Sequence, residues 1–340
     1  MTQVQLARDP IPAAPSPGRR GLPMVLERYG TIVGPAVEKA VDTLHPALRP
    51  ALMHHFGGQG KQVRGALVLL SAAAVGAPEA VAIPGAVALE LVHNFSLIHD
   101  DVIDGDEERR HQPTVWARFG LGQAVIGGDA LVLAAMELLL AEPVPARVRA
   151  AAVLAQATQA MIGGQAEDMA FEGRDKVTIE ECLAMEAGKT GALLACAASL
   201  GAILGEAPAP AVTALAEYGA HIGIAFQAVD DVLGIWGDPS VTGKPVGSDL
   251  LQRKRTLPVA VALAAGDSRA AELAELLDGR LEGPDLARAT ELLASGRRQA
   301  LTIAEAHVEN ALAALESADL APEPAAELVE LARFVSERDR

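Results

Sequence analysis

One short stretch joins an apolar segment to a group of charged side chains: SLIHDDVIDGDEERRHQPTVW, residues 96–116. Asp100, Asp101 and Asp104 lie within five positions of one another. Because positions i, i+3 and i+4 of a helix share one face, we expect the three carboxylates to point the same way near the carboxyl end of a helix. Like charges at the negative end of a helix dipole are unfavourable unless cations bind them. The stretch therefore predicts a helix that ends in a cation site.

The rest of the chain predicts an all-α fold. From about residue 24 onward it is rich in Ala, Leu, Glu and Arg, apolar residues recur every three or four positions, and no convincing alternating strand occurs. Segments such as GALLACAASLGAILG, residues 191–205, carry small residues that permit close helix contacts in a large bundle, and such a bundle can hold a site between facing helices. Helix breaks are expected at residues 57–58, 76–78, 120–128, 142–145, 205–210, 237–247, 279–284 and 322–324, which leaves about ten or more helices.

The domain limits follow from composition. Residues 1–23 hold five prolines and no continuous apolar run, so we expect a disordered tail there and one helical domain over residues 24–340.

The longest charge-free runs, residues 150–166 and 190–205, fall short of the ~20 apolar residues that span a bilayer, so no transmembrane segment is expected. Cys182 and Cys196 form no zinc or disulfide pattern, which makes a reducing cytoplasm the default location.

The charge balance bears on possible partners. Of the 340 residues, 28 are Lys or Arg and 44 are Asp or Glu, giving a net charge of −16. Such a chain repels the phosphates of DNA and RNA, so a nucleic acid is not an expected partner. Cations are favoured instead.

A second acidic pair lies 130 residues after the first, in AVDDVLGIWGD, residues 228–238. Asp230 and Asp231 again follow an apolar run, with Phe226 and Gln227 one turn before them. A single pair of this kind is also typical of a solvated helix end. Two pairs favour two helices that face each other and clamp a polyphosphate through Mg²⁺, which prefers oxygen ligands and bridges to substrate phosphates.

Basic residues follow both acidic clusters. Arg109 and Arg110 come just after the first, and Lys244 and Lys254 come after the second. Arg offers a bidentate fork and Lys a point charge, and both suit diphosphate oxygens. The segment DEERR, residues 106–110, also fits an exposed loop whose charges neutralise one another.

Together these residues resemble the trans-isoprenyl diphosphate synthase family, also called polyprenyl synthetases, over most of the chain outside the first 23 residues. The DDxxD motif and its following arginines match residues 100–110, and the second motif matches residues 226–231 and continues through the long string at residues 237–258. The resemblance implies a single large helical bundle of the isoprenoid synthase type with a central cavity.

The resemblance also implies roles for individual residues. The family's GKxxR element corresponds to residues 60–64, so Lys61, Arg64, His93 and Arg110 would hold the diphosphate of isopentenyl diphosphate. Gln165, Asp168, Lys189 and Thr190 match elements near the allylic diphosphate and its metals. The implied ligands of Mg²⁺, or of Mn²⁺ in its place, are Asp100, Asp101, Asp104, Asp230 and Asp231.

The implied reaction is head-to-tail condensation of an allylic diphosphate with isopentenyl diphosphate by a cytoplasmic homodimer. Phe95 and Ser96 match the positions where the family sets chain length, and a bulky residue followed by a small one implies the twenty-carbon geranylgeranyl product. Phe95 equally fits ordinary core packing. Two alternatives share the fold: a class I terpene cyclase, which generally needs more than the ten aromatic residues found here, and a non-catalytic partner subunit, which would be expected to lose the acidic motifs.

Two departures from the family pattern stand out. Gly234 replaces the last aspartate of the second motif, which predicts a weaker contribution from a third carboxylate. The family's common GGKRxRP has Gln62 and Gly65 here, so the fit of isopentenyl diphosphate differs from the usual one. His54 and His55 are expected at the surface or in a loop.

Overall fold

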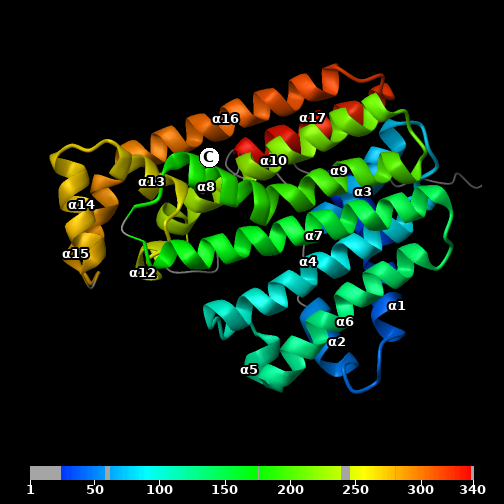
Figure 1. Cartoon of the computed structure of the whole chain (residues 1–340), viewed down its shortest axis with the longest axis horizontal. Coiled ribbons are helices and arrows are strands. Elements are labelled where there is room, and N and C mark those ends of the chain that lie inside the picture. The colour runs from blue at the N-terminus through cyan, green and yellow to red at the C-terminus, as the bar shows by residue number, and fades with distance from the viewer. Residues whose placement is uncertain (1–23, 58–61, 175, 239–245, 280, 338–340) are drawn as a thin grey trace, which may run out of the picture.

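The computed structural model describes residues 24–57, 62–174, 176–238, 246–279 and 281–337. The tail at residues 1–23 and the expected binding residues Lys61 and Lys244 lie outside these ranges. Within them the chain is almost wholly α-helical, as Figure 1 shows, and the predicted all-α fold is confirmed.

Long helices form the centre of the bundle: α4 (Ile83–Asp104), α7 (Pro145–Glu172), α9 (Ala192–Leu204), α10 (Ala209–Trp236) and α16 (Ala294–Glu316). Helix α10 lies against α9 and α16, α7 packs on α9, and α3 (Val63–Ala74) packs on both α4 and α9. The carboxyl ends of α4, α7 and α10 point toward the same end of the bundle (Figure 1). Both acidic clusters are therefore brought to that end.

Shorter elements cover this centre. They are α1 (Met24–Asp42), α2 (Arg49–Gly57), η1 (Glu79–Val81), α5 (Val115–Phe119), α6 (Leu121–Leu140), α8 (Ile179–Glu186), the π-helical turn η2 (Ala187–Gly191), α12 (Ser248–Leu251), α13 (Leu257–Ala264), α14 (Ser268–Asp278), α15 (Pro284–Leu292) and α17 (Pro322–Glu337).

Helix ends follow from local chemistry. Helices α4, α7 and α10 each carry a proline in their first turn, where its missing N–H is not needed. Helix α4 ends at Gly105, whose φ of 69° favours glycine. Helix α8 begins with a capping box, in which Thr178 and Glu181 each bind the other's backbone N–H.

The expected break at residues 120–128 is wrong beyond its first residue. Gly120, with a φ of 89°, separates α5 from α6, but α6 continues through Gly127 and Gly128. A Cβ at Gly128 would lie 2.2 Å from His99 Nε2 of α4. These glycines therefore allow α6 to approach its neighbours closely, and they do not end the helix.

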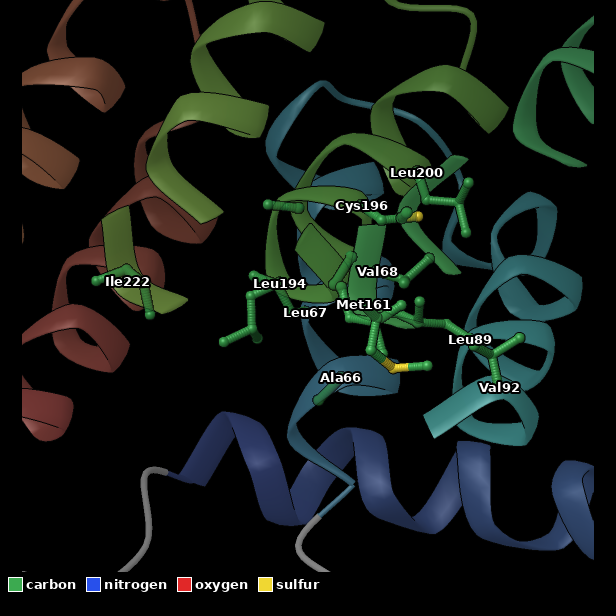
Figure 2. Packing of buried hydrophobic residues seen from close by; sticks show 14 of the residues in the cluster. Ala66, Leu67, Val68, Leu89, Val92, Met161, Leu194, Cys196, Leu200 and Ile222 are labelled. Carbon is green, nitrogen blue, oxygen red and sulfur yellow. The ribbon is translucent and has the colours of Figure 1, made fainter. Parts of the chain in front are cut away.

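The core between α3, α4 and α9 shows the same close packing (Figure 2). Leu67, Val68, Leu89 and Leu200 are all almost fully buried there. A Cβ at Gly201 of α9 would lie 2.0 Å from the carbonyl oxygen of Val68, so the two helix backbones touch. The small residues of this segment therefore allow the close helix contacts that were predicted from them.

A small hairpin interrupts the helices after α4. Strand β1 (Glu108–Arg109) pairs antiparallel with β2 (Gln112–Pro113). The two turn residues, Arg110 and His111, have φ values of 53° and 61°, as a two-residue type I′ turn requires. Residues 106–110, for which an exposed loop was the alternative, thus lead into a tight turn that folds Arg109 back toward α4.

Two helical segments, Leu121–Leu140 and Ile179–Leu204, are long and apolar enough to cross a membrane. The second is 72% buried inside the bundle, as a core helix would be. The first, which is α6, is only 33% buried and exposes one apolar side.

Candidate active site

A cavity of 1120 Å³ lies inside the bundle, bordered by α3, α4, α7, η2, α10 and α17. This volume lies slightly above the usual range of about 300–1000 Å³ for small-molecule sites. Predicted polar residues on its wall are Arg64, His93, Asp100, Arg109, Arg110, Gln165, Lys189, Thr190, Gln227 and Asp230, and the apolar part includes Phe95, Met161, Leu193, Phe226 and Phe334. A smaller cavity of 310 Å³ adjoins it, sharing Lys189, Gln227 and Asp230 and adding Asp168, Asp249 and Lys254.

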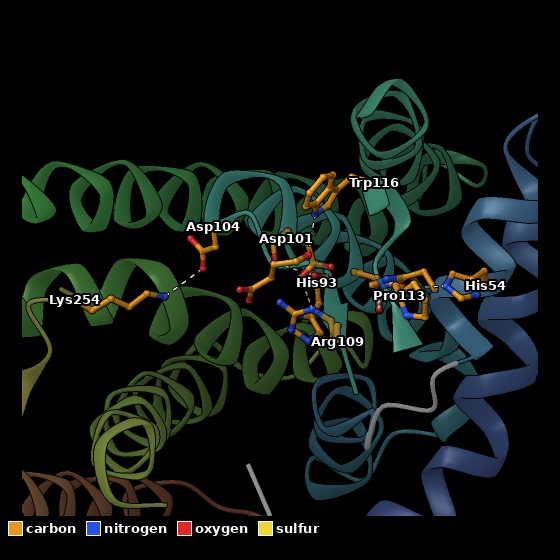
Figure 3. Close-up of polar contacts among 12 residues, drawn as sticks. His54, His93, Asp101, Asp104, Arg109, Pro113, Trp116 and Lys254 are labelled. Atoms are coloured by element: carbon orange, nitrogen blue, oxygen red, sulfur yellow. Dashed lines mark hydrogen bonds and ion pairs between the residues drawn. The ribbon is translucent and has the colours of Figure 1, made fainter. Parts of the chain in front are cut away.

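The first acidic cluster divides between two directions. Asp100 faces the large cavity, and Asp104 Oδ2 accepts a hydrogen bond from Lys254 Nζ at 3.2 Å (Figure 3). Asp101 is 1% exposed and turns the other way, where its Oδ1 accepts from Arg109 Nε at 2.7 Å. The prediction of a common face is therefore wrong for Asp101, because adjacent helix positions differ by about 100° around the axis.

Burial sets the charge state of this cluster. It raises the pKa of Asp100 to about 6, and the charge of Lys189 opposes this shift. Asp100 makes no hydrogen bond or ion pair with the part of the chain that the structure describes. Burial also raises the pKa of Asp101, opposed by Arg109, and its Oδ2 has no hydrogen-bond partner among the described residues. The described residues therefore do not fully compensate the negative charges of Asp100 and Asp101.

The second cluster also divides. Asp230 lines both cavities, whereas Asp231 borders only the smaller one and is 5% exposed. Asp231 Oδ1 accepts from Gln227 Nε2 at 2.8 Å and Oδ2 accepts from the backbone N–H of Leu257 at 2.9 Å. Thr190 Oγ1 in turn donates to Gln227 Oε1 at 2.7 Å. Asp231 was expected to bind metal, but both its oxygens already accept hydrogen bonds, and the one from Leu257 joins α10 to α13.

A buried group of acidic side chains lies behind Asp231. Its carboxylate, that of Glu186 and the thiol of Cys182 lie within 4.8 Å of one another. Burial raises the pKa of Asp231 to about 7 and that of Glu186 well above its ordinary value. Asp231 therefore belongs to the packed interior more than to the cavity wall.

Lys189 reaches the cavity from the π-helical turn η2. Its Nζ donates to Asp168 Oδ2 on α7 at 2.5 Å. A Cβ at Gly164 would lie 2.3 Å from the backbone nitrogen of Lys189, so α7 touches this turn directly. The wider turn places Lys189 on the cavity wall next to Thr190, as both were predicted to lie.

Lys254 follows α12 and lies between the two acidic clusters. Burial lowers its pKa, but the nearby charges of Asp104, Asp249 and Asp168 more than offset this, so the net direction is upward. Lys254 therefore stays protonated at neutral pH, and it adds a positive charge next to the carboxylates.

Arg64 and His93 lie in another part of the large cavity. Arg64 Nη1 lies 3.1 Å from His93 Nε2, and since a guanidinium can only donate, the imidazole nitrogen accepts. Burial lowers the pKa of His93 well below its ordinary value, which keeps the ring neutral. Arg64 Nε has no hydrogen-bond partner among the described residues. This guanidinium can therefore bind an anion, as predicted for it.

Two residues of this region, Glu90 and His55, were not among the predicted site residues. Glu90 is 4% exposed, and its Oε1 accepts from the backbone N–H of Gly65 at 2.8 Å. His55 is not a surface residue: it lines the cavity and donates from Nε2 to Asn94 Oδ1 at 3.0 Å. His54 donates to the carbonyl of Pro113 and so holds the hairpin (Figure 3). A single acidic residue in the apolar run AVALELV was the available signal for Glu90.

Phe95 and Ser96 both lie on the cavity wall below Asp100. Phe95 is 8% exposed, and its ring meets His99 edge-on at a centroid distance of 4.9 Å. Ser96 Oγ donates to the carbonyl of His93 at 2.8 Å. Phe95 thus both packs in the core and limits the cavity.

An all-α bundle whose interior brings acidic helix ends and fixed cations to one deep cavity defines an enzyme of the isoprenoid synthase fold class. The family model for polyprenyl synthetase matches residues 45–293. The chain belongs to this family and is a prenyltransferase.

Similar proteins agree with this assignment. The chain is 44% identical to a (2E,6E)-farnesyl diphosphate synthase of Mycobacterium tuberculosis strain H37Rv over 99% of both chains, and 40% identical to a geranylgeranyl diphosphate synthase of the same strain over 93% of both. It is also similar to the crystal structure of geranylgeranyl pyrophosphate synthase from Corynebacterium glutamicum complexed with isoprenyl diphosphate and magnesium. That match has a TM-score of 0.84 at 27% identity and covers 92% of this chain and 99% of the other.

Proposed function

We propose that the protein condenses an allylic diphosphate with isopentenyl diphosphate, head to tail, to give a trans-polyprenyl diphosphate. The observation that carries this proposal is the single 1120 Å³ cavity, whose wall includes both Asp100 and Asp230 and, separately, the pair Arg64 and His93. A condensing enzyme needs two diphosphate sites, whereas a cyclase needs one.

The donor set fits divalent cations. Asp100, Asp104 and Asp230 offer carboxylate oxygens, the ligands that Mg²⁺ prefers, and Mn²⁺ accepts the same set. Asp100 has no hydrogen bond or ion pair with the described residues, which leaves its charge available. We propose Asp100, Asp104 and Asp230 as the ligands, with Asp101 and Asp231 holding the two helix ends in place. The magnesium complex of the Corynebacterium relative supports this choice of ion.

Bound Mg²⁺ supplies charge neutralisation as the bond between the allylic carbon and its diphosphate breaks. Lys189 and Lys254 add fixed positive charge beside the same acidic clusters, so they stabilise the departing diphosphate without rearranging. Arg64, His93 and Arg110, with Lys61 expected to assist, would hold isopentenyl diphosphate with its double bond toward the allylic carbon. Such alignment contributes up to ~7 to 11 kcal/mol in well-positioned cases. The double bond of isopentenyl diphosphate then bonds to the allylic carbon, and the released diphosphate takes the proton that the condensed product loses. No side chain acts as a nucleophile.

We propose geranylgeranyl diphosphate as the product. The relatives carry both farnesyl and geranylgeranyl names, so similarity leaves the product length open. Phe95 and Ser96 lie side by side in sequence on the wall below Asp100, and the small Ser96 leaves room for the growing chain while Phe95 limits it.

Product analysis tests this function. Purified protein with Mg²⁺, isopentenyl diphosphate and a short allylic primer is expected to give a C20 diphosphate, identified by mass after conversion to the alcohol. Geranylgeranyl diphosphate supplied alone is expected to stay unchanged. A hydrocarbon from that second incubation, with no elongation in the first, would instead identify a terpene cyclase.

We also propose a homodimer that associates through α6. This helix exposes apolar side chains along one side, among them Leu121 (57%), Ile126 (58%) and Leu133 (69%). A monomer rarely leaves such a row in water, and a second copy offers a matching apolar row across a two-fold axis. Both cysteines, Cys182 and Cys196, are free and buried, which fits the reducing cytoplasm where we place the enzyme.

A further inference from the structure

Two histidine rings meet between α10 and α16, outside the reaction site. His221 Nδ1 lies 2.9 Å from His307 Nδ1, the ring centroids are 5.0 Å apart, and the ring planes cross at 50°. His221 comes about two and a half turns before Asp230 on α10, and neither histidine borders the 1120 Å³ or the 310 Å³ cavity. The proposed reaction therefore does not use this pair.

The packing around the pair holds both histidines on rigid helices. Tyr218, one turn before His221, is fully buried, and its hydroxyl donates to the carbonyl of Leu328 on α17 at 2.8 Å. On α16, the small residues Ala304 and Ala311 on either side of His307 are buried and let this helix lie close against α10. Both rings thus extend from backbones that core contacts keep in place, as a preorganised site requires.

Each ring can present a nitrogen lone pair to a ligand. In the neutral pair, one Nδ1 donates its hydrogen to the other. Burial lowers the pKa of His307, and the charge of His221 lowers it further, so an additional proton on the pair is disfavoured. When the donor's hydrogen moves from Nδ1 to Nε2, both rings are neutral and both Nδ1 atoms carry a lone pair. Since both histidines are only partly buried, each Nε2–H can bond to water.

The separation of the two nitrogens fits a shared metal ion. Imidazole nitrogens bind Zn²⁺ at about 2.0–2.1 Å, so two of them on one ion lie about 2.9 Å apart at a right angle and about 3.4 Å apart at the tetrahedral angle. A small rotation of each ring about its χ2 bond covers this range and directs both lone pairs at one ion. Imidazole suits Zn²⁺, Cu²⁺ and Ni²⁺, whereas Mg²⁺ prefers carboxylate and water oxygens. The pair therefore differs from the acidic clusters in the metals that it can select.

We propose that His221 and His307 form a binding site for a divalent transition metal of the Zn²⁺, Cu²⁺ and Ni²⁺ class. The two Nδ1 atoms are the protein ligands, and water completes the coordination because the rings are partly exposed. The bound ion ties α10 to α16 and so braces the helix that carries Asp230. This site is separate from the Mg²⁺ ligands, and the inference stands whether or not the proposed condensation does.

Electron paramagnetic resonance of Cu²⁺ tests the site, because a nitrogen ligand splits the copper signal and a carboxylate oxygen does not. Metal-free protein with one equivalent of Cu²⁺ is expected to show two nitrogen ligands. His307→Gln and His221→Gln are each expected to lose that pattern and to weaken Cu²⁺ binding by at least about 10-fold. His45→Gln, at an exposed position before α2, is the matched control and is expected to bind Cu²⁺ like the wild type.

Two results would overturn the inference. One is a wild-type spectrum with oxygen ligands alone, and the other is an unchanged nitrogen pattern in both His221→Gln and His307→Gln. Circular dichroism is recorded on both variants, and the two together keep the test decisive if one of them folds poorly. Asp100→Asn separates this site from the reaction site: it is expected to keep the nitrogen pattern, and a loss of the pattern would place the copper at the acidic cluster instead.

Discussion

Lys254 Nζ donates a hydrogen bond to Asp104 Oδ2 at 3.2 Å, although the two residues are 150 positions apart. The contact ties the carboxyl end of α4 to the segment after α12 and places a protonated amine between the two acidic clusters. This ion pair therefore links the first acidic cluster to the segment that follows the second one.

Removing that amine tests its catalytic role. Lys254→Ala is expected to lower kcat by about 10²- to 10³-fold, because a fixed charge beside the departing diphosphate is lost. Steady-state release of product from an allylic primer gives the measurement. Lys39→Ala, at an exposed position of α1, is the control. An undiminished kcat in Lys254→Ala would exclude the amine from the chemical step.

The raised pKa of Asp100 predicts a pH-dependent stability. With a pKa of about 6 when folded and 3.8 ordinarily, Asp100 holds a proton in the folded state at pH values where the unfolded chain has lost it. Stability of the metal-free protein therefore falls as pH rises from about 4 to 6. Asp100→Asn is expected to be more stable than the wild type at pH 8, by roughly 1–3 kcal/mol, and equal to it near pH 4. Thermal melts in a chelator measure this, and equal curves at pH 8 would contradict it.

Product length is expected to respond to the two wall residues in opposite directions. Ser96→Phe fills space below Asp100 and is expected to shift the product toward C15. Phe95→Ala opens the wall and is expected to extend the product beyond C20. Mass analysis of the released alcohols reads out both. If both variants release the same product as the wild type, Phe95 serves core packing alone and does not set the product length.

Association through α6 can be broken at one residue. Leu133 is 69% exposed, and Leu133→Glu places a charge in the apolar row, so the dimer is expected to dissociate. Light scattering coupled to size-exclusion chromatography gives the mass of each species. Val81→Glu changes an exposed apolar residue outside α6 and is the matched control. A Leu133→Glu protein of unchanged mass would place the interface elsewhere.

Restoring the family's usual proline at position 65 is expected to harm this chain. Gly65→Pro removes the N–H that binds Glu90 Oε1 and leaves a buried carboxyl without that donor, at a cost of about 1–3 kcal/mol. A Cβ would also lie 2.8 Å from Val33 Cγ1. Gly163→Ala, where a Cβ meets nothing within 4 Å, is the control and is expected to be neutral or stabilising. Urea unfolding compares the variants, and unchanged stability in Gly65→Pro would show that the Gly65 bond is dispensable.

The sequence was sufficient for the features that depend on local periodicity. Apolar spacing predicted the helices, and two acidic pairs after apolar runs predicted where Asp100 and Asp230 line the cavities and where Asp104 binds Lys254. Gln227 lies one turn before Asp231, and its Nε2 donates a hydrogen bond to Asp231 Oδ1.

Features that depend on packing between distant segments could not be predicted in this way. The direction of Asp101 follows from the hairpin that brings Arg109 beneath it, and the carboxylate of Asp249 lies beside Gly234 because α12 attaches to α10. His55 looked like a surface residue because nothing nearby in sequence reveals Asn94 as its partner.

The π-helical turn Ala187–Gly191 limits how the length of this chain can vary. It holds one residue more than an α-helical turn would need. Deleting a single residue there would restore regular helix geometry and leave α8 and α9 nearly in their present phase, but it would remove the local displacement that brings Lys189 to Asp168. A one-residue gap in this turn is therefore expected to cost the chain its ion pair between Lys189 and Asp168 while the rest of the bundle keeps its packing.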